Sequence, residues 1–125
     1  MLEDQESEFI LGIFLMEAWD TVASVEDGVR RLAGGDPPSS EIVDPLVVVA
    51  HRLKGAAALH GYPVVSAVAL VMENLLETLP GQPAREWGRT IEVLGDVLVT
   101  VRRVLEMIGD DGREDVATVS RLRAR

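Results

Sequence analysis

Apolar residues recur at alternating steps of four and three in several long segments of the chain, and this spacing constrains the fold more than any other feature. In the first segment the repeating positions are Leu11, Leu15, Ala18, Val22, Val25, Val29 and Leu32. Such spacing places apolar side chains along one stripe of an α-helix, whereas no segment alternates cleanly with the two-residue period of a β-strand. Four amphipathic helices joined by short loops predict an all-α fold, an antiparallel four-helix bundle.

Glycine and proline residues set the expected limits of these helices. We expect a bundle over about residues 7–108, with helices at about 7–32, 45–60, 63–79 and 84–108 separated by Gly- and Pro-rich loops. Asp44 followed by Pro45 predicts the start of the second helix, because Asp is a good N-cap and Pro is favoured at the first helical position, and a short turn over residues 39–43 can precede it. A short additional C-terminal helix is expected over about residues 114–122.

Size and charge limit the classes of protein to which the chain can belong. A length of 125 residues predicts a single domain over residues 1–125, and the absence of cysteine excludes disulfide and thiolate chemistry. The net charge of −9 argues against a nucleic-acid partner, which needs a basic surface. No apolar run approaches the length needed to span a bilayer, so we expect a soluble cytoplasmic protein without a membrane partner.

The predicted second helix contains an unusual stretch, residues 50–58, with the sequence Ala-His-Arg-Leu-Lys-Gly-Ala-Ala-Ala. Lys54, Gly55 and Ala58 all fall within about 60° of His51 around this helix, so the imidazole stands beside a cation and above very small residues. Lys54 is the only lysine of the chain, and its compact ammonium suits a phosphate group. A neutral imidazole is a nucleophile at cellular pH, so His51 is a candidate reactive group that a large partner can approach.

The pattern His-x-x-Lys-Gly-Ala at His51 resembles the phosphorylation motif of histidine-containing phosphotransfer (HPt) domains. Residues 70–77, Leu-Val-Met-Glu-Asn-Leu-Leu-Glu, and residues 14–18, Phe-Leu-Met-Glu-Ala, resemble helices of the first domain of chemotaxis-type (CheA family) histidine kinases. The likeness covers about residues 9–80. It implies that His51 is the phosphoacceptor and that Glu73 hydrogen-bonds it. From their places beside His51 on the helix, we expect Lys54 to assist and Gly55 and Ala58 to leave a surface open to partner domains.

The resemblance implies a phosphate carrier that is not an enzyme on its own. His51 would accept phosphate from the ATP-binding domain of a histidine kinase and pass it to an aspartate of a response-regulator receiver domain. The sequence contains no glycine-rich phosphate loop and no His-x-x-x-His pair, so ATP and magnesium are expected from the partner domains and no cofactor from this one. The chain would be the N-terminal domain of a CheA-like kinase or, alternatively, a stand-alone phosphorelay protein.

Two alternatives of other classes remain open from the sequence. A small enzyme with His51 as general base and Glu73 as its orienting group would need a substrate pocket and an oxyanion-stabilising group. A non-catalytic helical interaction module would leave the single lysine and Gly55 unexplained. Glu73 could also be an ordinary solvent-exposed charge, and the glycines within the first helix, Gly12 and Gly28, have no evident role.

Overall fold

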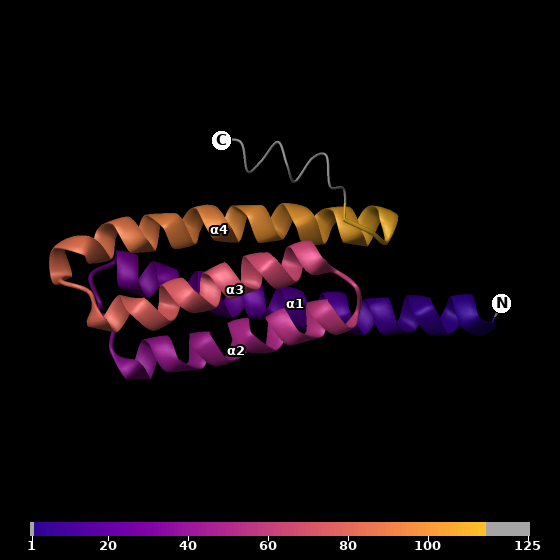
Figure 1. Cartoon of the computed structure of the whole chain (residues 1–125), viewed down its shortest axis with the longest axis horizontal. Helices are drawn as coiled ribbons and strands as arrows, with labels where there is room; N and C mark the ends of the chain where they lie inside the picture. The colour runs from indigo at the N-terminus through magenta and orange to yellow at the C-terminus, as the bar shows by residue number, and fades with distance from the viewer. Residues whose placement is uncertain (1, 115–125) are drawn as a thin grey trace.

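The structure is a computed structural model that describes residues 2–114, and these residues form a bundle of four α-helices without a strand. The elements in chain order are α1 (Leu2–Ala33), α2 (Ser40–Leu59), α3 (Pro63–Thr78), the short 3₁₀-helix η1 (Leu79–Gly81) and α4 (Ala84–Asp111). Successive α-helices run in opposite directions, and both α1 and α3 pack against α2 and α4 (Figure 1). The predicted all-α antiparallel four-helix bundle is therefore confirmed. The predicted C-terminal helix over about residues 114–122 lies outside the described residues apart from Glu114, which is not helical.

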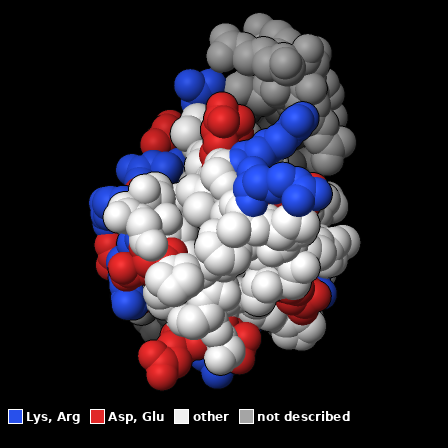
Figure 2. Space-filling model, turned by 90° about the vertical axis from the view of Figure 1, so that its left-hand side faces the viewer, with Lys and Arg blue, Asp and Glu red and all other residues white. Residues whose placement is uncertain are grey.

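Each helix contributes one apolar face to a common core, as the four-three spacing predicts. The largest fully buried side chains are Phe14, Met72, Leu76, Leu79, Leu94, Leu105 and Ile108. Phe14 is the first buried residue of α1, and the preceding turns extend past the loop between α2 and α3 with Phe9 and Ile10 exposed (Figure 1). Seen from the opposite end of the bundle, uncharged residues occupy the centre and charged side chains lie around the edge (Figure 2).

The second helix begins at Ser40, so the predicted start at Asp44 and Pro45 is wrong. Ser39 is the N-cap, and its carbonyl oxygen accepts hydrogen bonds from the amides of Ile42 at 3.1 Å and Val43 at 2.9 Å. Ile42 and Val43 are buried in the core, so apolar burial stabilises this additional turn. Pro45 lacks an amide hydrogen, but the helical carbonyl left without its donor belongs to the exposed residue Glu41 and can be solvated.

Gly28 is explained by close packing between α1 and α2. A Cβ atom at this position would lie 2.3 Å from Leu46 Cδ1, far inside van der Waals contact. Glycine therefore allows the buried side chain of Leu46 to pack directly on the backbone of α1. A Cβ atom at Gly12 would meet nothing within 4 Å, and nothing in the structure explains that residue.

One segment corrects the expectation about membrane-spanning length. Among the described residues, Pro63–Gly81, which comprises α3 and η1, is long and apolar enough to cross a membrane by length and composition alone. Within the bundle, however, Val65, Ala69, Met72 and Leu76 of this segment are fully buried. Packing of α3 between α2 and α4 thus accounts for these four residues, whereas Leu70 and Val71 of the same helix are exposed.

The chain after α4 fixes the N-terminus of α3. Gly112 ends α4 in the left-handed conformation with φ 73°, and the Tyr62 hydroxyl donates a hydrogen bond to its carbonyl oxygen at 3.1 Å. The Glu114 carboxylate then accepts hydrogen bonds from the amides of Val64 at 3.1 Å and Val65 at 2.8 Å. These amides belong to the first turn of α3 and have no partner inside the helix, and a carboxylate there is also favoured by the helix dipole. Burial, and then the charge of Glu114, raise the pKa of the Tyr62 phenol.

Candidate functional site

His51, Lys54 and Glu73 meet on one side of the bundle, where α2 faces α3. His51 Nδ1 lies 2.7 Å from Glu73 Oε2, and Lys54 Nζ donates a hydrogen bond to Glu73 Oε1 at 3.0 Å. The side chain of Glu73 is 8% exposed, whereas that of His51 is 67% exposed. The structure therefore brings together the three residues that the sequence singled out, and the interpretation of Glu73 as a solvent-exposed charge is wrong.

The electrostatics of Glu73 determine which nitrogen of His51 carries the proton. The hydrogen bond from Lys54 lowers the pKa of the Glu73 carboxyl, burial opposes this effect, and the hydrogen bond with His51 adds to it. Glu73 is then a carboxylate at neutral pH and can only accept hydrogen bonds, so the proton in the 2.7 Å contact belongs to Nδ1. A neutral imidazole protonated at Nδ1 has a free lone pair on Nε2. The contact thus leaves Nε2 as the nucleophilic nitrogen of an exposed side chain.

Small residues let α3 approach α2 closely enough for these contacts. His51 and Lys54 are one helical turn apart on α2, so both side chains can reach the same group on α3. Ala50 and Ala57 of α2 are fully buried, as is Ala69 of α3, which precedes Glu73 by one turn. The Ser66 hydroxyl of α3 also donates a hydrogen bond to the carbonyl oxygen of Lys54 at 2.9 Å.

The surface beside His51 on α2 is open. Gly55 and Ala58 are both exposed, and a Cβ atom at position 55 would meet nothing within 4 Å. Gly55 is therefore not required for packing against any other described helix, in contrast to Gly28. A second molecule can reach the imidazole over this surface without first displacing a side chain at position 55.

The second histidine lies apart from this site. His60 is the C-cap residue of α2, where its amide donates to the carbonyl oxygen of Ala56, and its ring centroid lies 5.1 Å from that of Phe14. His60 therefore caps the end of α2 and packs against Phe14 of α1. Residues 2–114 contain no group of three or more His, Cys, Asp or Glu side chains placed to hold a metal ion.

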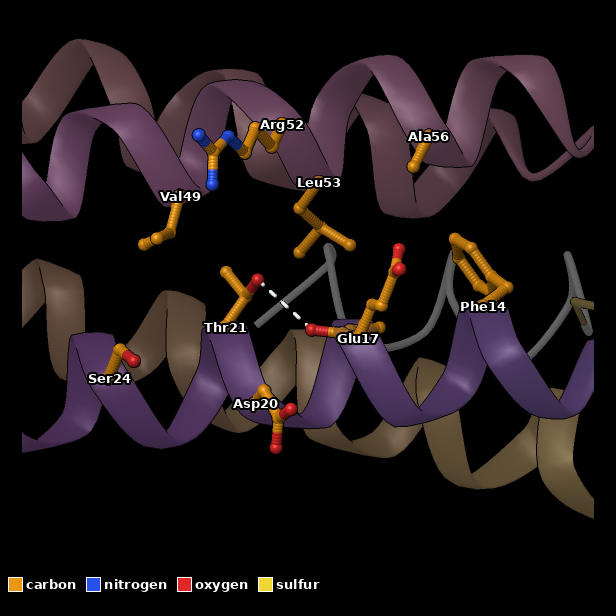
Figure 3. A pocket seen from close by; sticks show the side chains of 10 residues that line it. Phe14, Glu17, Asp20, Thr21, Ser24, Val49, Arg52, Leu53 and Ala56 are labelled. Carbon is orange, nitrogen blue, oxygen red and sulfur yellow. Dashed lines mark hydrogen bonds between the residues drawn. The ribbon is translucent and has the colours of Figure 1, made fainter.

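A groove of about 330 Å³ runs between α1 and α2 (Figure 3). Its lining residues are Phe14, Glu17, Ala18, Asp20, Thr21, Ser24, Val49, Arg52, Leu53 and Ala56. None of His51, Lys54 or Glu73 lines this groove, although Arg52 follows His51 directly in the chain. The groove therefore does not provide the substrate pocket that a general base at His51 would need.

Comparison with known proteins identifies relatives over almost the whole chain. The family model of the Hpt domain matches residues 10–110, a range that includes His51, Lys54 and Glu73. No solved structure gives a significant match.

Three chemotaxis proteins CheA are similar to the chain. The protein from Treponema pallidum is 29% identical over 124 residues, that from Bacillus subtilis 26% over 112 residues, and that from Borreliella burgdorferi 25% over 122 residues. These alignments cover 97%, 88% and 98% of this chain but only 15%, 16% and 14% of the respective CheA proteins. The chain thus spans about one-seventh of the length of these relatives.

Proposed function

The chain belongs to the Hpt domain family, and from that membership we propose that it carries a phosphoryl group on Nε2 of His51 in two-component signalling. One observation supports this assignment above all others. An exposed imidazole has its Nδ1 held by a buried carboxylate, which leaves the outward nitrogen with a free lone pair. The similarity to three CheA proteins supports the same class of signalling protein.

In the proposed reaction, Nε2 attacks the γ-phosphorus of ATP held by a kinase domain. A bond forms between nitrogen and phosphorus, and the bond from phosphorus to the β,γ-bridging oxygen breaks with release of ADP. The imidazole ring gains positive charge because Nδ1 keeps its proton, and the Glu73 carboxylate at 2.7 Å stabilises that charge. Glu73 thus acts as the orienting group that holds the ring tautomer, a role that carboxylates also have beside other reactive histidines.

Transfer to the receiver domain reverses this chemistry. An aspartate oxygen of the receiver attacks phosphorus, the nitrogen–phosphorus bond breaks, and its electron pair returns to Nε2. Lys54 uses one of its three N–H donors on Glu73, so the others remain for phosphoryl oxygens. Gly55 and Ala58 would form the surface over which the partner domain reaches the phosphoryl group.

We further propose that the chain is the phosphoacceptor domain of a CheA-like kinase, a single domain whose partners are the ATP-binding domain of that kinase and a receiver domain. This setting would be cytoplasmic, and the partner domains would hold ATP and magnesium. The three CheA relatives support this assignment over the alternative of a stand-alone phosphorelay protein.

Labelling with phosphate from ATP in the presence of a CheA kinase domain tests the proposal. The wild-type chain should acquire label that is stable to base and labile to acid, as expected for a phosphohistidine, and His51→Gln should acquire none. His51 is largely exposed, and Gln can also donate a hydrogen bond to Glu73, so the replacement should cost about 1 kcal/mol or less and the helical circular dichroism should be retained. His60→Gln is the matched control and should be labelled normally. Label that persists in His51→Gln, or that disappears only in His60→Gln, would refute the assignment.

A further inference from the structure

The hydroxyl of Ser66 joins α3 to the main chain of α2 near the candidate site. Ser66 Oγ donates a hydrogen bond to the carbonyl oxygen of Lys54 at 2.9 Å, in a partly buried position. Ser66 precedes Glu73 by seven residues, which is two helical turns or about 10 Å, so both side chains project from the same face of α3. Helix α3 is thus bonded to α2 at two levels, one through Ser66 and the other through Glu73.

The hydrogen bonds of Glu73 and that of Ser66 differ in how firmly they fix the position of α3 relative to α2. Glu73 bonds to the ends of two side chains, and one of these is the flexible four-carbon chain of Lys54. Ser66 instead bonds to a backbone atom within α2, whose position is set by the helix itself. The buried residues of these two helices include three alanines, Ala50, Ala57 and Ala69, whose short side chains permit close approach but interdigitate little. These alanines alone offer little resistance to a small axial shift of α3 along α2, and the Ser66 hydrogen bond opposes such a shift directly. The larger buried side chains Met72 and Leu76 and the Glu114 carboxylate hold α3 within the bundle as a whole.

We propose that Ser66 is a positioning residue for the phosphorylation of His51, because its hydrogen bond to Lys54 fixes the axial position of α3 that places Glu73 on Nδ1. The inference rests on the proposed function of His51. Without the Ser66 bond, α3 occupies positions in which Glu73 no longer meets Nδ1, and the population with the proton on Nε2 rises. That tautomer has no lone pair on the exposed nitrogen and cannot attack phosphorus.

Ser66→Ala tests this role, and the chain offers two matched controls. Ser66→Thr retains the hydroxyl and should behave like the wild type. Thr78→Ala removes another hydroxyl of α3, one that donates to the Leu75 carbonyl oxygen at 3.1 Å and so bonds only within its own helix. Alanine is the strongest helix former, so the variants should stay folded, and thermal unfolding checks this.

Two measurements are made on each variant. The ¹⁵N spectrum of the His51 ring, assigned with His60→Gln, distinguishes the protonated nitrogen from the bare one without any phosphorylation. The initial rate of labelling by the kinase domain reports the chemical step. Ser66→Ala should shift the ring towards the Nε2–H tautomer and lower the labelling rate about three- to tenfold, the range expected for losing one net hydrogen bond. Ser66→Thr and Thr78→Ala should match the wild type in both measurements.

The combination of readouts separates failure of this inference from failure of the proposed function. An unchanged ring tautomer in Ser66→Ala would overturn the role of Ser66, whatever happens to the rate. An equal loss of rate in Thr78→Ala would also overturn it, because the effect would then come from weakening α3 in general. If the wild-type chain is not labelled at all, the proposed function fails, but the ring spectrum still decides whether Ser66 holds Glu73 on Nδ1.

Discussion

Replacing Gly55 by Gln should raise the stability of the protein slightly. Gly55 is exposed inside α2, and a Cβ atom there would meet nothing within 4 Å, so the new side chain displaces nothing. Glycine in a helix interior costs up to about 1 kcal/mol relative to alanine, and glutamine is among the better helix formers. For a domain of this size a gain of that order raises the melting temperature by about 3–5 °C. Thermal unfolding followed by circular dichroism measures the change.

The same substitution should slow phosphotransfer. Position 55 lies about 40° around α2 from His51 and roughly one turn further along, so a Gln side chain stands beside the approach to Nε2. A partner domain must bring its reacting atom within bonding distance of a phosphoryl group or of Nε2, and a steric cost of about 1.4 kcal/mol already lowers the rate tenfold. We expect at least that loss, both for labelling by the kinase domain and for transfer to a receiver.

Gly28→Gln is the matched control because it should have the opposite effects. Its gain in helix propensity is the same as at position 55, but its side chain would occupy the space filled by the buried side chain of Leu46, and overpacking of this kind typically costs about 1–3 kcal/mol. The melting temperature should therefore fall, while the folded protein is still labelled on His51. If Gly55→Gln melts below the wild type, or transfers phosphate at the wild-type rate, the interpretation of Gly55 as an open approach to His51 is wrong.

Two further predictions concern carboxylates that hold α3. Lys54, and then His51, lower the pKa of the Glu73 carboxyl in the folded protein. Ionised Glu73 therefore stabilises the folded state at pH values above the ordinary pKa of glutamate, near 4.3, and this stabilisation is lost as the pH falls through the lowered pKa of Glu73. The difference in free energy of unfolding between wild type and Glu73→Gln, measured in urea, should thus shrink as the pH falls below about 4, and a difference that stays unchanged over that range would contradict the assignment. Glu114→Gln weakens the two hydrogen bonds to the first turn of α3 and should lower the free energy of unfolding by about 1 kcal/mol. The control Glu106→Gln changes an exposed residue of α4 and should leave the free energy of unfolding unchanged. Equal melting temperatures for both variants would show that Glu114 is not an effective cap.

The helices and the position of His51 could be predicted from the sequence because both depend on local spacing. The four-three repeat defines each buried face, and the three-residue step from His51 to Lys54 places both on one side of α2. The contact with Glu73 could not be derived in this way, since spacing within one helix does not say which residue of another helix it meets. The family resemblance supplied that pairing, and the structure contains it at 2.7 Å.

The features that the sequence did not reveal arise from tertiary contacts. Asp44 and Pro45 form a good local start signal, but the burial of Ile42 and Val43 outweighs it and extends the helix. Bonds from Glu114 to residues about 50 positions earlier have no local signature at all.

Gly28 had a signal that could have been found. It stands three residues after Val25 and four before Leu32, and both of these residues belong to the buried stripe of α1. A glycine in such a position of a stripe indicates that another element packs directly on the helix backbone. Here that element is α2, whose Leu46 side chain packs on the backbone at Gly28.

In this site the His51 side chain is exposed to solvent, yet the orientation of its ring is fixed from the buried side by Glu73. A histidine that is 67% exposed can meet a large partner, but an imidazole with that freedom would populate both tautomers and several ring orientations if nothing held it. Glu73 removes this freedom from the buried side, where its carboxylate is shielded from water and therefore holds Nδ1 more strongly than an exposed one would. A carboxylate that is only 8% exposed needs a cationic partner to remain ionised, and Lys54 supplies it at 3.0 Å. The single lysine of the chain thus acts on His51 through Glu73, because the charge of Glu73 keeps the proton on Nδ1 and leaves the lone pair on Nε2.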